Sequence, residues 1–176
     1  EKTREALDEE GWVSSGDIGL LLDDGSIKII DRKKNIFKLA QGEYIAPEKI
    51  ENVYAQHNLV QQAYVHGDSL QSQLVAVVVP DPETFIPWAG QQIGAKVTLA
   101  SLANLAQDPR VVQKLLDDLT KAGKRAGLHG FELCKAIHLE VDPFSIENNL
   151  LTPTLKLKRQ DAQKKYTEQI ATIRGR

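Results

Sequence analysis

Three segments concentrate the side chains that could do chemistry. Residues 11–17 bring two glycines, two hydroxyls and the carboxylate of Asp17 together, residues 31–34 are four charged residues in a row, and residues 156–159 form a basic cluster. Carboxylates accept hydrogen bonds from hydroxyls and cations, while lysine and arginine can hold negatively charged oxygens. These segments are therefore candidate sites, although turns and solvated surface faces have the same composition.

The thiol and the imidazoles give no comparable pattern. Cys134 follows an apolar turn and has no evident basic partner, so we expect a small core or edge residue and not a nucleophile. One cysteine also excludes an internal disulfide and suits a reducing compartment. We predict no metal site, because the histidines lack the spacing of metal ligands: His57, His66, His129 and His138.

Composition limits the class of partner. The chain has 22 basic and 24 acidic residues and a formal net charge of −2, which gives no electrostatic reason to expect nucleic acid or an anionic membrane as a partner. A hydrophobic content of 41% supports one core, and the apolar runs are too short to span a bilayer. Because the chain begins at Glu1 and contains no methionine, we expect a piece of a longer protein.

The elements that would position these segments can be read from periodicity and turn signals. Asp23-Asp-Gly25 is a hairpin turn signal, Gly42 opens a turn, and Asp108-Pro109 is a helix start. We predict a break at Pro80, Pro82 and Pro87, and an α+β fold in which a small mixed or antiparallel sheet is flanked by helices and preceded by a β-hairpin. The expected elements are a charged tail or frayed helix at 1–10, a hairpin at 18–22 and 26–31, a short strand at 36–39, helices from 47, 99 and 109, core strands at 60–66, 74–79 and 135–141, and a final helix from about 160.

Four segments also occur together, in this order and at roughly these separations, in one protein family: residues 11–17, 29–34, 41–48 and 150–159. Together they resemble the C-terminal part of eukaryotic long-chain fatty acyl-CoA synthetases, which are acyl-adenylate-forming enzymes. The resemblance covers residues 11 to about 160. It implies that residues 1–33 end a large N-terminal adenylation domain and that residues 34–176 are a mobile C-terminal domain.

The resemblance implies a two-step ligase reaction. Fatty acid and ATP, with Mg²⁺, would give an acyl-adenylate and pyrophosphate, and CoA would then displace AMP to give the thioester. The implied partners are these substrates and the N-terminal domain of the same polypeptide, with no nucleic acid and no cofactor held tightly by these residues alone. The intact protein would lie on the cytoplasmic side, with membrane association at the endoplasmic reticulum, peroxisome or lipid droplet.

The resemblance also assigns roles to single residues. Asp17 would bind the ribose hydroxyls of ATP, Arg32 would lie beside the ribose and phosphate, Lys34 would be the hinge between the two domains, and Gly42 would border the pantetheine channel. Each has a plainer alternative from the residues alone. Asp17 could cap a turn, Arg32 could form a surface ion pair, Lys34 could be one charge of a solvated run, and Gly42 could be a turn glycine.

Lys156 corresponds to the catalytic lysine of the family, in the Thr-Pro-Thr-x-Lys form of the long-chain branch. Its ammonium would lie between the carboxylate oxygen and the α-phosphate during adenylate formation. For Lys156, Lys158 and Arg159 together the alternative is an exposed, inert basic cluster. Because Gly42 and Lys156 would serve different steps, we expect them on well-separated faces.

Two other functions are compatible with the sequence. One is the C-terminal domain of another acyl- or aryl-CoA ligase, whose acid pocket would lie in the other domain. The second is a noncatalytic interaction module of the same fold. The phosphate-binding loop of the family does not occur in these residues, so we expect the 176-residue chain to be inactive on its own.

Overall fold

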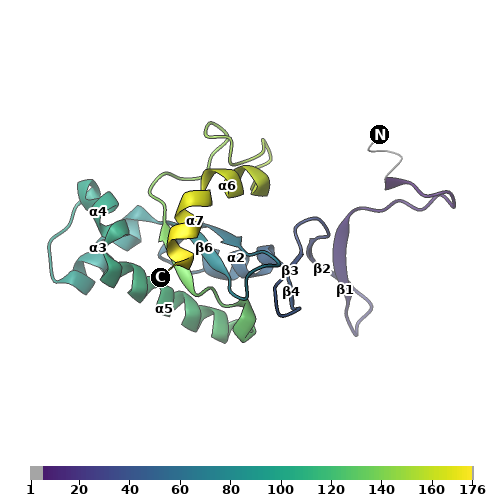
Figure 1. Cartoon of the computed structure of the whole chain (residues 1–176), viewed down its shortest axis with the longest axis horizontal. Coiled ribbons are helices and arrows are strands. Elements are labelled where there is room, and N and C mark those ends of the chain that lie inside the picture. The colour runs from purple at the N-terminus through teal and green to yellow at the C-terminus, as the bar shows by residue number, and fades with distance from the viewer. Residues whose placement is uncertain (1–5, 176) are drawn as a thin grey trace.

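The computed structural model describes residues 6–175, so the first half of the expected charged tail, residues 1–5, lies outside the described residues. Helices pack on a small sheet to form a body, and a β-hairpin projects from one end of it (Figure 1). The central strand of this sheet pairs antiparallel with one neighbour and parallel with the other. The predicted α+β fold, with a small mixed sheet preceded by a hairpin, is therefore confirmed.

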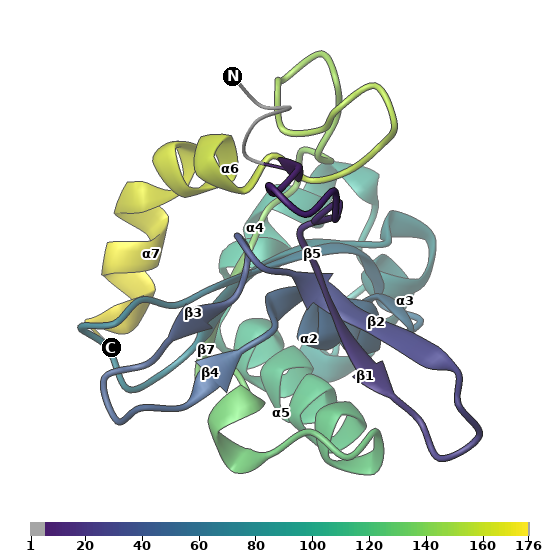
Figure 2. The same ribbon diagram turned by 90° about the vertical axis from the view of Figure 1, so that its right-hand side faces the viewer.

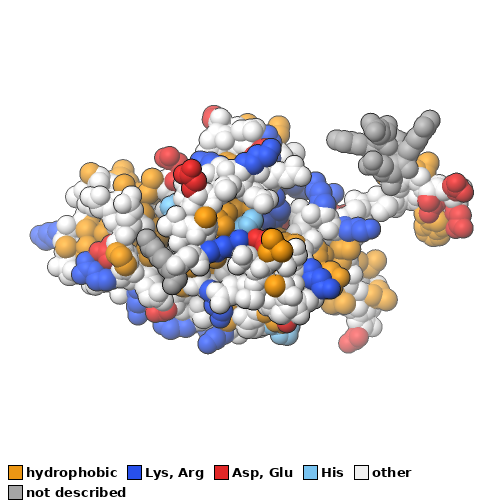
Figure 3. Space-filling view, viewed as in Figure 1, with side chains coloured by type: hydrophobic (Ala, Val, Ile, Leu, Met, Phe, Trp, Pro, Cys, Tyr) orange, Lys and Arg blue, Asp and Glu red, His pale blue; other side chains and the backbone are white. Residues whose placement is uncertain are grey.

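The projecting hairpin consists of β1 (Asp17–Leu21) and β2 (Ile27–Arg32), paired antiparallel as predicted. Gly25 in its turn has a φ of +83°, a left-handed conformation that glycine adopts without strain. Apolar side chains gather at this end of the molecule (Figure 3). Those exposed on the two strands are Ile18, Leu20, Leu21, Ile27 and Ile29. An apolar surface of this kind is typical of a segment that packs against another structure.

A second, much shorter hairpin follows the charged segment. It pairs β3 (Phe37–Lys38) with β4 (Tyr44–Ile45), and its turn contains Gly42. The predicted strand at 36–39 is therefore present, with a partner that the periodicity did not reveal.

The sheet of the body has the order β5 (Val60–His66), β6 (Val75–Pro80), β7 (Ala136–Leu139). All six residues of β6 are buried, as the uninterrupted apolar run predicted for a strand covered on both faces. β5 is antiparallel to β6, and β7 is parallel to it. The long connection from β6 to β7 carries three of the helices, as a parallel crossover requires.

Side chains of β6 alternate between two hydrophobic cores. Ala76 and Val78 belong to the larger core, and Val75, Val77 and Val79 belong to the smaller one. Figure 2 shows helices on both sides of the sheet. The larger core is covered by α2 (Pro47–Ala55), α3 (Pro82–Ile93), α4 (Leu102–Gln107), α5 (Pro109–Arg125) and the 3-10 turn Gly130–Glu132. The 3-10 turn Leu99–Ser101 precedes α4 and has no buried residue. The smaller core is covered by α6 (Arg159–Lys165) and α7 (Thr167–Arg174).

The predicted start of α5 is confirmed. The Asp108 carboxylate accepts a hydrogen bond from the Arg110 N–H at 2.9 Å, and Pro109 occupies the first helical position. This is the ordinary combination of an N-cap and a proline whose missing N–H is not needed there.

The predicted break across residues 80–87 is wrong, because α3 occupies this segment. Asp81 caps the helix by accepting from the Glu83 N–H at 2.9 Å, and Pro82 takes the first helical position. Pro87 lies inside the helix and cannot donate a backbone hydrogen bond. The complete burial of Phe85 and Ala89 offsets that loss.

The predicted single C-terminal helix is divided at Tyr166. The hydroxyl of Thr167 donates to the carbonyl oxygens of Gln163 and Lys164 at 2.8 and 3.1 Å. A side-chain donor that competes for helical carbonyls in this way bends or interrupts a helix. The bend keeps the buried Tyr166 and Ile170 on the smaller core.

Candidate functional site

Asp17 and Arg32 lie opposite each other in the hairpin register. The guanidinium Nε of Arg32 is 2.7 Å from Oδ1 of Asp17, and the two side chains are 45% and 25% exposed. The carboxylate of Asp17 therefore pairs with arginine across the strands, and Arg32 pairs with Asp17 although Asp31 is its neighbour in sequence. This places a carboxylate and a fork of donors side by side and open to solvent, which suits a ligand with hydroxyls and phosphate.

The turn that contains Lys34 joins β2 to β3. Lys34 is exposed, and the backbone N–H groups of Asn35 and Ile36 both donate to the carbonyl oxygen of Arg32, at 2.9 and 3.3 Å. This is a tight local turn between the hairpin and the body (Figure 1). The role of Lys34 as a hinge stays a prediction.

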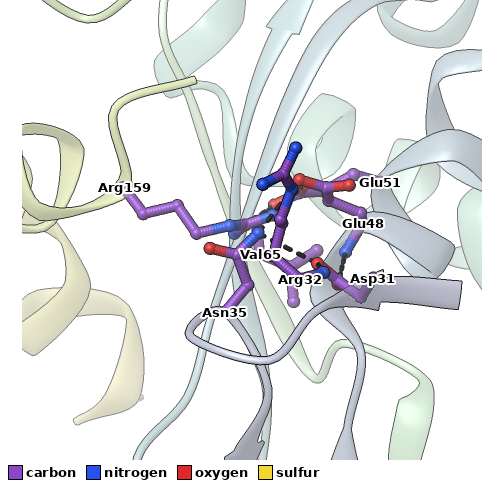
Figure 4. A network of polar contacts seen from close by, with 7 residues as sticks. All are labelled: Asp31, Arg32, Asn35, Glu48, Glu51, Val65 and Arg159. Atoms are coloured by element: carbon purple, nitrogen blue, oxygen red, sulfur yellow. Dashed lines mark hydrogen bonds and ion pairs between the residues drawn. The ribbon is translucent and has the colours of Figure 1, made fainter. Parts of the chain in front are cut away.

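Asp31 is buried at the end of β2, with 2% of its surface exposed. Its Oδ1 accepts hydrogen bonds from the Arg32 N–H at 2.6 Å and the Asn35 side-chain amide at 2.9 Å, and its Oδ2 accepts from the Glu48 N–H at 2.9 Å. Figure 4 shows the carboxylate between these donors. A residue that the sequence places in a solvated charge run is thus an interior anchor.

A second network lies next to it and joins three elements (Figure 4). The guanidinium of Arg159, at the start of α6, donates to both oxygens of Glu51 on α2, at 2.9 and 2.5 Å. Glu51 also accepts from the Val65 N–H of β5 at 2.7 Å. The side chains of Arg159 and Glu51 are only 17% and 12% exposed. The exposed-cluster alternative is therefore wrong for Arg159, which is a buried link between α6, α2 and β5.

The charges of this pair depend on each other. Burial raises the pKa of Glu51 above its ordinary value, and the Arg159 cation opposes that shift. Burial disfavours the charge of Arg159, but Glu51 more than compensates, so the pKa of Arg159 is raised and the guanidinium stays charged. The interaction that holds α6 is thus a buried, bidentate ion pair.

Lys156 lies in a closed loop immediately before α6. The backbone N–H of Thr152 donates to the Lys156 carbonyl oxygen at 2.8 Å, and the Lys156 N–H donates to Oγ1 of Thr152 at 3.1 Å. Leu155 has a φ of +58°, and an antiparallel bridge between Leu151 and Leu157 closes the loop at its base. The Lys156 residue is exposed, and no described side chain hydrogen bonds with its ammonium. The main chain is therefore fixed while the ammonium points to solvent.

The neighbouring Lys158 has a different role in the structure. It is half-buried, and its ammonium donates to Oδ1 of Asn149 at 2.5 Å. The register that separates Lys156 from Lys158 and Arg159 in the sequence therefore corresponds to three environments: an exposed ammonium, an ammonium tied to the loop, and a buried guanidinium.

Gly42 has a φ of +106°, so the turn between β3 and β4 by itself requires glycine. A Cβ there would lie 3.8 Å from Cε of Lys38 and would meet no closer atom outside the neighbouring residues. The plainer alternative, a turn glycine, is thus sufficient to explain this residue in the structure. The Lys38 ammonium lies 5.5 Å from the centre of the Tyr44 ring.

The hairpin that contains Gly42 and the loop that contains Lys156 project from different sides of the body in Figures 1 and 2. The first contacts the β5–β6 connection, where the Gln41 amide donates to the Ser72 carbonyl oxygen at 3.0 Å. A cleft of about 620 Å³ lies between the Lys34 turn and the start of α6. Its lining includes Lys34, Asn35, Thr152, Lys158 and Arg159. The structure therefore brings Lys34 and the base of the Lys156 loop to one cleft, and leaves Gly42 outside it.

The Cys134 thiol lies outside this cleft, whereas His66 is among the residues that line it. Cys134 is buried, its N–H donates to Oη of Tyr54 at 3.1 Å, and burial raises the pKa of its thiol to about 12. Within residues 6–175 no three His, Cys, Asp or Glu side chains are grouped so that they could hold a metal ion. None of the helices in that range is long and apolar enough to cross a bilayer.

The chain is similar to known proteins at two levels, and the first is the class of domain. Residues 49–125, from α2 to the end of α5, match the family described as the AMP-binding enzyme C-terminal domain. A solved structure agrees over nearly the whole chain. It is the adenylation domain of a carboxylic acid reductase from Segniliparus rugosus, in complex with AMP and a carboxylic acid, with a TM-score of 0.82 and 33% identity over 99% of this chain and 25% of that one. Residues 49–125 are thus similar in sequence to an AMP-binding enzyme C-terminal domain, and the chain as a whole is similar in fold to this adenylation domain.

The particular branch follows from sequence identity. The chain is 54% identical to long-chain-fatty-acid–CoA ligase 5 of Rattus norvegicus, over 98% of this chain and 25% of the relative. It is 52% identical to peroxisomal long chain acyl-CoA synthetase 7 of Arabidopsis thaliana, over 98% of this chain and 24% of the relative. It thus spans about a quarter of the length of the curated relatives that it matches. The resemblance to long-chain acyl-CoA ligases that the motifs indicate is confirmed over almost the whole chain.

Sequence reasoning missed the residues that hold the site together. The sequence gives no structural role to four of these residues: Asp31, Asn35, Glu48 and Glu51. It also does not distinguish Arg159 from Lys156 and Lys158 in the basic cluster. One available signal was the missing cap of α2. Ala46 occupies the N-cap position and has no side chain to accept a hydrogen bond, so an acceptor from elsewhere was to be expected.

Proposed function

We propose that the chain is the C-terminal part of a long-chain fatty acid–CoA ligase, which forms an acyl-adenylate from fatty acid and ATP and then the thioester with CoA. The single observation that supports this most strongly is the 54% identity to a long-chain-fatty-acid–CoA ligase across 98% of the chain. Residues 1–33 would end the N-terminal adenylation domain, and residues 34–176 would be the mobile domain. The exposed apolar hairpin supports this division, because it offers a surface for a larger domain to cover.

Lys156 would act in the first step. Its fixed backbone and exposed ammonium support this role, because the charge can reach beyond the domain to a site on its partner. There the ammonium would hold the carboxylate oxygen of the fatty acid and the α-phosphate of ATP together and offset the negative charge that builds up between them. Asp17 and Arg32, side by side and open to solvent, would bind the ribose hydroxyls and the phosphate.

Lys34 and Gly42 would serve the change between the steps. The tight turn between the hairpin and the body supports Lys34 as the hinge, because a few dihedral angles there would reorient the whole body. Gly42, on a different side from the Lys156 loop, would face the shared site in the second step and leave room for pantetheine. Mg²⁺ would accompany ATP and supply charge neutralisation on the phosphates. We place the intact protein on the cytoplasmic side of an organelle membrane, of the peroxisome, endoplasmic reticulum or lipid droplet.

The decisive experiment separates the two half-reactions in the intact protein. Lys156→Ala should slow adenylate formation, measured by exchange of pyrophosphate into ATP, by roughly 10² to 10³, because it removes one preorganised charge from the transition state. Thioester formation from supplied acyl-adenylate should be spared. Lys158→Ala is the matched control and should change neither step much, since that ammonium is tied to Asn149. Equal loss of both steps in Lys156→Ala would contradict the assigned role.

The 176-residue chain alone should make no acyl-CoA, because it contains no phosphate-binding loop for ATP. Incubation of the purified chain with ATP, oleate, CoA and Mg²⁺, followed by mass spectrometry of the products, tests this. Turnover would contradict the proposed division of labour between the two domains.

A further inference from the structure

The described hairpin and body are connected by very few polar contacts besides the chain itself. Among residues 6–175, the only side-chain hydrogen bonds that join residues 6–33 to residues 35–175 are the two that Asp31 accepts, from Asn35 and from Glu48. The other hydrogen bonds across Lys34 are the local backbone hydrogen bonds of the turn. One buried carboxylate therefore accepts both of the side-chain hydrogen bonds that join the described hairpin to the body.

Asp31 and its two donors lie on opposite sides of Lys34. Asp31 ends β2, before the turn, whereas the Asn35 amide and the Glu48 N–H come after it. A rotation of the body about Lys34 moves both donors while Asp31 stays with the hairpin. Hydrogen bonds depend steeply on distance and angle, so a large rotation breaks these two bonds.

The bond to Glu48 also completes a helix. α2 begins at Pro47, and its N-cap residue, Ala46, provides no side-chain acceptor. Asp31 accepts from the free Glu48 N–H in place of a local cap, and its negative charge faces the positive end of the helix. The cap of α2 is thus available in one orientation of the body and is withdrawn when the body turns.

We propose that Asp31 is a positioning residue that latches one orientation of the body across the Lys34 hinge, and that the latch must open whenever the body turns. Contacts made in only one of two orientations set their relative populations. The latch accordingly favours the orientation seen here and delays departure from it. This inference rests on the hinge proposed above, but it concerns a property that the chain can show without any substrate.

The test uses the 176-residue chain with a pair of spin labels, at Lys28 on the hairpin and Lys114 on α5, both exposed. Cys134 is buried and can stay in place. The unmodified chain should give a narrow distance distribution. Asp31→Ala should broaden it and raise the hydrogen-exchange rate of the Glu48 amide roughly fivefold to tenfold, as expected for the loss of a helix cap.

Two further variants keep the test decisive. Asp24→Asn removes a carboxylate from the same hairpin, but Asp24 accepts only from Ser26 in the turn, so the distribution should stay narrow. Asn35→Ala removes one bond across the hinge and the bond from the Asn35 amide to the Glu48 carboxylate, but it leaves the bond from the Glu48 N–H to Asp31 in place. It should broaden the distribution in part even if Asp31→Ala perturbs the helix. An unchanged distribution in both Asp31→Ala and Asn35→Ala would overturn the proposal.

The outcome is separable from the proposed function. If the distribution broadens as expected while the intact protein makes no acyl-CoA, the function fails and the latch stands. If the intact protein is an active ligase but Asp31→Ala leaves the distance distribution unchanged, the latch is wrong and the proposed function stands. In an active ligase, Asp31→Ala should change the ratio of the two half-reaction rates, which a uniform loss of stability would leave unaltered.

Discussion

The molecule contains two arginine–carboxylate pairs that look alike in chemistry and differ in setting. Arg32 and Asp17 meet on the projecting hairpin with side chains 45% and 25% exposed, whereas Arg159 and Glu51 meet inside the body with 17% and 12% exposed. An exposed pair contributes little to stability and is free to exchange partners for a ligand. A buried bidentate pair fixes the elements it joins, because either member left alone would be a buried, uncompensated charge.

The largest expected effect breaks the buried pair. Glu51→Ala should lower the free energy of unfolding of the chain by about 3–5 kcal/mol, since it leaves Arg159 buried without a partner. Urea denaturation followed by circular dichroism measures this. The double replacement Glu51→Leu with Arg159→Met should restore most of the loss, because two apolar side chains leave no unpaired charge. A double variant as unstable as Glu51→Ala would show that the stranded charge does not account for the cost, and would point to the Val65 N–H, which loses its acceptor in both variants.

The pH dependence of stability should come from the body alone. Burial lowers the pKa of His57, His66 and His138, in His66 with a further contribution from the Arg174 cation. An imidazole with a lowered pKa in the folded state stabilises the fold above its unfolded pKa, about 6.5, and loses this contribution as the pH falls through its folded pKa. The free energy of unfolding in urea should therefore decrease between pH 7.5 and pH 5.5.

His66→Gln should reduce that decrease, because glutamine can still hydrogen bond with the Tyr64 hydroxyl, which lies 3.0 Å from Nδ1 of His66, but does not titrate. The hairpin, residues 17–32, contains no histidine and offers no competing source. Stability that stayed constant or rose over this range would contradict the assignment.

The smallest effect on stability is expected at the exposed pair. Arg32→Ala should change the free energy of unfolding by at most about 1 kcal/mol, as exposed ion pairs usually do. If the proposed nucleotide role is right, the same substitution in the intact protein should raise the KM for ATP, measured in the pyrophosphate exchange assay. A large destabilisation with an unaltered KM would mean that the two pairs do the same structural work.

The elements that sequence predicted well are those with a strong local signal. The Asp23-Asp-Gly25 turn, the Asp108-Pro109 helix start and the apolar run of β6 each have a local physical cause, and each occurs in the structure where expected. α3 was missed because Pro87 argued locally against a helix, while the compensating burial of Phe85 depends on tertiary packing that no local pattern contains.

The candidate site likewise contains residues that local sequence predicts and residues that only long-range contacts define. The positions of Asp17, Arg32 and Lys156 could be predicted because motifs fix their register, and their roles stay predictions. Asp31 and Arg159 could not be separated from their charged neighbours, because what distinguishes them is a partner 17 residues away in one case and 108 in the other. Contacts over such distances in sequence appear only when the chain folds.

The alternation of β6 between two cores also sets an order for folding during synthesis. Everything that packs on the larger core, including β7, precedes residue 142, while the smaller core needs α6 and α7, beyond residue 158. A nascent chain can therefore close one side of the sheet while Val75, Val77 and Val79 still lack their cover. During that interval this apolar face of β6 is exposed to solvent. A chaperone that binds exposed apolar segments could therefore bind it until α6 and α7 have left the ribosome.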